Sequence, residues 1–74
     1  MLTKRQITQE FIEMAEKAAR LENQFLEKEK EFNETGQTEL ADLNGSIARD
    51  YRQVAHAYKE SARLLNENTA PWED

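Results

Sequence analysis

The sequence predicts an all-α protein folded as an antiparallel helical hairpin, in which a short loop joins two long helices. Apolar residues recur at helical spacing through two segments of about 30 residues each, and a glycine-containing break separates these segments. The chain of 74 residues contains one Pro, two Gly and no Cys, so little else interrupts the pattern. This length suits one small domain, which we place at 1–68, followed by a C-terminal tail at 69–74.

The first predicted helix covers residues 4–34. Its apolar residues fall within one half of a helical wheel, which is typical of an amphipathic helix. They are Ile7, Phe11, Met14, Ala15, Ala18, Leu21, Phe25 and Phe32, with Ile12 and Leu26 at the edge. Thr3, followed three residues later by Gln6, predicts a capping box at the start of this helix.

Residues 33–38 interrupt the apolar pattern and predict the turn between the helices. Gly36 suits the position just after a helix, because glycine tolerates a positive φ angle. Thr38 is expected to cap the second helix, with Glu39 near the positive end of the helix dipole.

The second predicted helix covers residues 38–67, and its apolar residues step by three and four. The stripe consists of Leu40, Leu43, Ile47, Tyr51, Val54, Tyr58, Ala62 and Leu65. Its 11-residue repeat favours a straight or slightly right-handed helix over a strict heptad coil. Asn44-Gly45 is a strong turn signal, yet the stripe passes through it in phase. The pattern favours one continuous or kinked helix, with a break into two helices as the alternative.

Self-association is expected because one neighbouring helix cannot cover the wide apolar arc of the first helix. A hairpin of these segments would bring Phe32 near Leu40 and Phe25 near Ile47. With no disulfide to add stability, a homodimer that forms a four-helix bundle would supply the missing burial. The expected core and oligomer residues are Ile7, Phe11, Met14, Leu21, Phe25, Phe32, Leu40, Leu43, Ile47, Val54 and Leu65.

A basic ridge lies along the second helix, on the side away from its apolar stripe. It consists of Arg49, Arg52, His56, Lys59 and Arg63, which step by three and four. Residues 45–65 carry a net charge of +2 and residues 22–42 carry −5, within a chain of net charge −5. The ridge is interpreted either as a solvated face that pairs with acidic residues or as a site for nucleic acid or an acidic protein. A weak helix-turn-helix pattern around Gly45 would place Arg49 and Arg52 on a recognition helix.

Catalysis and metal binding have little support in the sequence. The single His, His56, has no Ser and acid placed to form a triad with it, and the absence of Cys removes thiolate sites. Glu22 and Glu29 lie on the apolar side of the first helix but lack the Glu-x-x-His pairs of a di-metal bundle. They are interpreted as polar residues that set register or reach the rim, with Tyr51 as a donor to Glu22. We therefore expect no catalytic residue, metal, cofactor or small-molecule substrate. No apolar run reaches the roughly 18 residues of a membrane span, and the expected location is the cytoplasm.

The function predicted from the sequence is that of a non-enzymatic interaction or regulatory module. It would self-associate and present charged faces to a macromolecular partner, by apolar burial and charge complementarity. One alternative is a small RNA- or DNA-binding regulator that uses the basic ridge. Another is an acidic inhibitor of the kind found in phages, which mimics the charge of nucleic acid. Trp72, in the polar tail, either folds back onto the end of its own bundle or docks to a partner.

Overall fold

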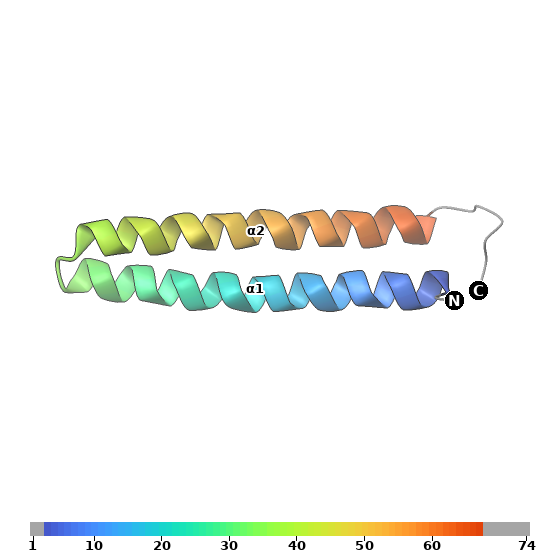
Figure 1. Cartoon of the computed structure of the whole chain (residues 1–74), viewed down its shortest axis with the longest axis horizontal. Coiled ribbons are helices and arrows are strands. Elements are labelled where there is room, and N and C mark those ends of the chain that lie inside the picture. The colour runs from blue at the N-terminus through green and yellow to red at the C-terminus, as the bar shows by residue number, and fades with distance from the viewer. Residues whose placement is uncertain (1–2, 68–74) are drawn as a thin grey trace.

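Two antiparallel helices make up nearly all of residues 3–67, the part of the chain that the computed structural model describes (Figure 1). α1 spans Lys4–Glu34 and α2 spans Thr38–Glu67, and the two lie side by side along their length. The radius of gyration is 16.7 Å, whereas a compact chain of this length has about 11 Å. The predicted all-α hairpin is confirmed, and its shape is that of a rod.

The start of α1 is capped as the sequence predicts. The hydroxyl of Thr3 accepts a hydrogen bond from the backbone N–H of Gln6 at 3.1 Å, and the Gln6 side chain accepts one from the Thr3 N–H at 2.8 Å. This reciprocal pair satisfies two backbone donors that the first turn of a helix leaves without partners.

The turn between the helices depends on Gly36, whose φ angle is +77°. The Gly36 N–H donates to the carbonyl of Asn33 at 3.2 Å, and the Gln37 N–H donates to the carbonyl of Phe32 at 2.8 Å. This is the Schellman arrangement expected when glycine follows a helix. The Gln37 carbonyl then accepts from the Ala41 N–H at 3.0 Å, so Gln37 caps α2 and Thr38 is its first residue. The prediction that Thr38 is the cap was therefore wrong by one residue.

α2 runs without a break through Asn44-Gly45. The Asn44 side chain donates to the Leu40 carbonyl one turn earlier at 2.7 Å, which satisfies the amide inside the helix instead of opening a turn. Both residues are buried against α1. The continuous helix is confirmed, and the helix-turn-helix interpretation was wrong because α2 contains no turn at this point.

The helices meet along a seam that follows a seven-residue repeat. On α2 the seam contains Ala41, Ala48, Ala55 and Ala62, each buried, alternating with Asn44, Tyr51, Tyr58 and Leu65. On α1 it contains Thr8, Phe11, Ala15, Ala18, Glu22, Phe25, Glu29 and Phe32. Every one of these positions is buried or half-buried. The expected 11-residue repeat was therefore wrong for the contact between the helices, which has the heptad spacing of a coiled coil.

Aromatic pairs fix the register of the hairpin. The rings of Phe25 and Tyr51 lie nearly parallel with centroids 5.7 Å apart, and those of Phe11 and Tyr58 are 6.0 Å apart. The seam thus combines phenylalanines of α1 with tyrosines and small, buried alanines of α2. Among residues 3–67 the buried apolar side chains are all alanines, and no large side chain is fully buried.

Candidate interaction surfaces

An outer apolar face lies along one side of the hairpin. Each seven-residue repeat places two residues in the seam. In an antiparallel pair, the residue that precedes the first of these two lies on the same side of the hairpin in both helices. Here three of the four such positions on each helix are apolar, the exceptions being Lys28 and Ser61, and a second row on α2 extends the face outward. We define the outer apolar face as Ile7, Met14, Leu21, Leu40, Leu43, Ile47, Val54 and Leu64.

Large side chains on this face remain in contact with solvent in the single chain. Leu43 and Leu64 are 56% and 57% exposed, and Met14, Leu40 and Val54 are each exposed by about two fifths. Single exposed apolar residues are common on proteins, but a contiguous row of them marks an interaction site. The face runs parallel to the alanine seam, so the hairpin buries its small apolar residues and leaves many large ones outside.

The sequence-predicted core residues divide into three groups in the structure. Phe11, Phe25, Phe32 and Leu65 lie half-buried in the seam. Ile7, Leu21 and Ile47 lie half-buried beside it on the outer apolar face. Met14, Leu40, Leu43 and Val54 are exposed. Leu40 and Ile47 lie beside the seam and not in it, because the buried Ala41 and Ala48 occupy the seam positions. The expected proximity of Phe32 to Leu40 and of Phe25 to Ile47 stays a prediction.

The basic ridge is exposed along its whole length, as expected for residues outside the core. Arg49, Arg52, His56, Lys59 and Arg63 are all exposed. They lie on the side of α2 away from the outer apolar face, so a contact at one surface leaves the other open. The ridge is not a uniform row of available cations, however, because some of its guanidiniums are held by carboxylates of the same chain.

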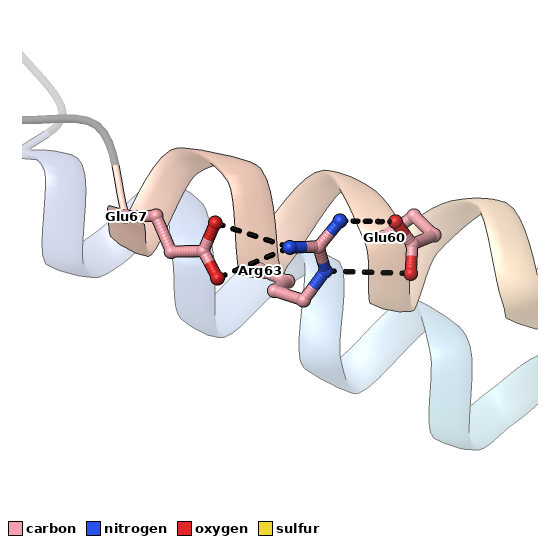
Figure 2. Close-up of polar contacts among 3 residues, drawn as sticks. All are labelled: Glu60, Arg63 and Glu67. Atoms are coloured by element: carbon pink, nitrogen blue, oxygen red, sulfur yellow. Dashed lines mark hydrogen bonds and ion pairs between the residues drawn. The ribbon is translucent and has the colours of Figure 1, made fainter.

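Arg63 lies between two carboxylates of α2, as Figure 2 shows. Its Nη2 is 2.7 Å from the Oε2 of Glu60, and its Nη1 is 3.1 Å from both carboxylate oxygens of Glu67. The hydrogen bond and charge of Arg63 lower the pKa of the Glu60 carboxyl below its usual 4.5. Hydrogen bonds to Glu60 and then to Glu67 raise the pKa of Arg63 further above its usual value. This guanidinium stays charged, and its field is largely neutralised locally.

Arg52 joins the two helices through a second ion pair. Its Nε is 2.8 Å from the Oε2 of Glu22, whose side chain is only 17% exposed at the edge of the seam. Glu22 was interpreted as a polar residue that sets register, and its bond to Arg52 across the helices supports that role. The sequence suggested Tyr51 as a donor to Glu22, whereas the Tyr51 ring stacks on Phe25.

Glu29, the other carboxylate of the seam, extends over Gly45. A Cβ atom added to Gly45 would lie 2.8 Å from the Glu29 Cδ and closer still to one carboxylate oxygen. The absence of a side chain at Gly45 therefore makes room for the Glu29 carboxylate. Glycine weakens a helix interior, and here the space that its missing Cβ leaves is occupied by the flexible end of Glu29.

The residues that sequence reasoning missed are the seam alanines and Leu64. Ala41, Ala48 and Ala55 carry a signal in their spacing of seven residues, but small side chains contribute little to a pattern weighted by hydrophobicity. Leu64 lies next to Leu65 in the sequence, and only Leu65 was assigned to the stripe. Trp72 lies outside the described residues, so its two interpretations stay predictions.

A metal cluster and a membrane span have no counterpart in the described residues. Within 3–67, no group of three or more acidic or His side chains is arranged to hold a metal ion. No helix in this part of the chain is long and apolar enough to cross a membrane. Comparison with protein-family models, curated proteins and solved structures finds no match to this chain.

Proposed function

We propose that this protein is a non-enzymatic interaction module whose hairpin self-associates through the outer apolar face and presents charged surfaces to a macromolecular partner. The observation that carries the proposal is that the hairpin fully buries small apolar side chains and leaves large ones exposed. The fully buried seam side chains are mainly alanines, whereas leucines, a valine and a methionine stand exposed on one side and Ile12 is exposed on the other side of α1. Burial of large side chains is the main source of folding free energy, and a lone hairpin forgoes much of it.

A second copy is the occupant that the dimensions of the face favour. Two helices of about 45 Å length and 10 Å diameter, side by side, present roughly 900 Å² on one side. A standard-size interface takes about 800 Å² from each partner. A copy of the same face is apolar over the same length, so an isologous contact would cover both faces at once.

Self-association can be tested with a matched pair of lysine substitutions three residues apart on α2. Leu43→Lys introduces a charge into the outer apolar face, whereas Ser46→Lys places the same charge at an exposed position outside it. Leu43 is 56% exposed in the chain, so covering it contributes about 1 kcal/mol per copy, or roughly a 30-fold change in the dimer dissociation constant. We expect at least that weakening for Leu43→Lys and little change for Ser46→Lys, measured by sedimentation equilibrium.

The thermal midpoint provides a second readout. If assembly stabilises the folded hairpin, the midpoint of the unmodified protein should rise with protein concentration, because association removes folded chains from the folding equilibrium. A monomer at micromolar concentration with a concentration-independent midpoint would contradict the proposed function.

Nucleic-acid binding by the basic ridge remains a separate proposal, and the ion pairs of Arg52 and Arg63 give it no support. It predicts binding to labelled RNA or DNA that weakens steeply with salt. Replacement of Arg49 and Lys59 by Glu should then reduce binding across sequences and flatten its salt dependence. Competition with nucleic acid for a basic protein target would instead support the acidic-inhibitor alternative.

A further inference from the structure

We propose that two hairpins associate antiparallel, with α2 of one copy lying along α2 of the other. This inference rests on the self-association proposed above and adds the helix that makes the contact, its orientation and its register. It commits the outer apolar face to a second copy of the same chain.

α2 is the helix at the centre of the contact because only it carries two adjacent apolar rows on this side. One row contains Leu40, Ile47, Val54 and Ser61, and the next contains Leu43, Asp50, Ala57 and Leu64. The corresponding outer row of α1 is polar and contains Glu10, Lys17, Gln24 and Glu31. The most exposed large apolar side chains, Leu43 and Leu64, lie in the outer row of α2. A partner helix would therefore cover more apolar surface on α2 than on α1.

The two rows of α2 together form a second heptad stripe beside the seam. When this stripe packs against an antiparallel copy of itself over its full length, each layer of the contact combines one residue from each row. The layers are Leu40 with the partner's Leu64, Leu43 with the partner's Ser61, Ile47 with the partner's Ala57, and Asp50 with the partner's Val54. Apart from the outermost layer, most layers combine a large side chain with a small one. The space between the two helices is therefore similar from layer to layer. A parallel pair would set identical residues together, and the layers at Ala57 and Ser61 would leave voids.

Asp50 favours the antiparallel orientation most strongly. In a parallel pair the two Asp50 carboxylates would face each other in one layer, and like charges in a partly desolvated layer repel strongly. In the antiparallel pair each Asp50 faces Val54, four residues away from the other carboxylate, which is about 6 Å along the helix axis. A single polar residue in an apolar stripe is a known device for setting the orientation of coiled coils.

The charges of α2 favour the same orientation. Residues 38–50 carry a net charge of −2 and residues 51–67 carry +1. Antiparallel packing places the acidic half of each α2 over the basic half of the other, and it also opposes the two helix dipoles. The row of Ile7, Met14 and Leu21 on α1 would then close the inner side of a four-helix bundle in which neighbouring helices run antiparallel.

Single cysteines can read the orientation, because the natural chain contains none. Leu40→Cys and Leu64→Cys are prepared separately, mixed and oxidised, and each variant is also oxidised alone. A disulfide requires Cα atoms within about 7 Å, so we expect the mixture to give a mixed disulfide in roughly tenfold excess over the disulfide of either variant with itself. Leu43→Cys with Ser61→Cys is an independent second pair. His56→Cys with Leu64→Cys is the control, because His56 lies on the basic ridge.

Each outcome decides the proposal. Preferential self-linking of Leu40→Cys and Leu64→Cys would mean parallel helices and would overturn the proposal. A dimer by sedimentation that links through neither pair would also overturn it, while leaving the proposed self-association intact. A monomer by sedimentation would overturn the proposed self-association itself. If Asp50 sets the orientation, adding Asp50→Leu to Leu40→Cys should increase the self-linked fraction several-fold, and an unchanged fraction would remove Asp50 from the argument.

Discussion

The two glycines of this chain should respond oppositely to the same substitution by alanine. At Gly45 the backbone is helical, and replacement of glycine by alanine inside a helix contributes about 1 kcal/mol. The new Cβ would lie 2.8 Å from the Glu29 Cδ, but that group is the end of a flexible side chain and can turn toward solvent. We expect Gly45→Ala to stabilise the protein by roughly 0.5–1 kcal/mol, because the helical gain exceeds the cost of moving Glu29.

At Gly36 the balance is reversed. No atom lies within 4 Å of an added Cβ, but the φ angle of +77° is unfavourable for alanine. A left-handed conformation costs an L-residue about 1–2 kcal/mol, and the restriction of the unfolded chain recovers part of this. We expect Gly36→Ala to destabilise by about 1 kcal/mol, so the two variants should differ by roughly 2 kcal/mol.

Urea unfolding followed by circular dichroism measures both variants, at one fixed protein concentration because assembly shifts the apparent stability. The double variant Glu29→Ala/Gly45→Ala tests the cause, since without the carboxylate the helical gain should appear in full. The reasoning fails if Gly45→Ala destabilises by more than about 1 kcal/mol and the removal of Glu29 does not restore stability. In that case the backbones themselves, rather than one flexible side chain, require glycine.

Two further predictions follow from the seam and from the ion pairs. Ala48 is 0% exposed, so Ala48→Leu should destabilise by about 1–3 kcal/mol in the same unfolding assay; Ser46→Leu, on the exposed side, should change stability by less than about 0.5 kcal/mol. Arg63 lowers the pKa of Glu60 in the folded chain. The small stabilisation from this ion pair is therefore present at pH values above the ordinary Glu pKa, and it is lost as the pH falls through the lowered pKa of Glu60. NMR titration of the Glu60 carboxyl should therefore show a higher pKa in Arg63→Gln, and an unchanged value would mean that the pair does not form in solution.

The helices, their ends and the loop could be predicted from the sequence because they depend on local interactions. Thr3 and Gln6 lie within one helical turn, and the positive φ angle of Gly36 needs no contact with the other helix. The continuity of α2 through Gly45 was also visible, because an unbroken apolar phase over many residues outweighs one local turn signal. The exposure of the basic ridge followed from the same wheel.

Which stripe of α2 faces α1 was decided only by the tertiary structure. Two apolar stripes run along this helix one residue apart. A pattern weighted by hydrophobicity merges them into a single stripe, which begins at Leu40 in the outer apolar face and ends at Leu65 in the seam. The choice depends on fit, since large phenylalanines on the α1 side of the seam leave room for small residues on the α2 side, and Ala41, Ala48, Ala55 and Ala62 are such residues. Shape complementarity between helices is a property of the pair, so the periodicity of one helix determines that it has an apolar side but not which of two adjacent rows its neighbour will occupy.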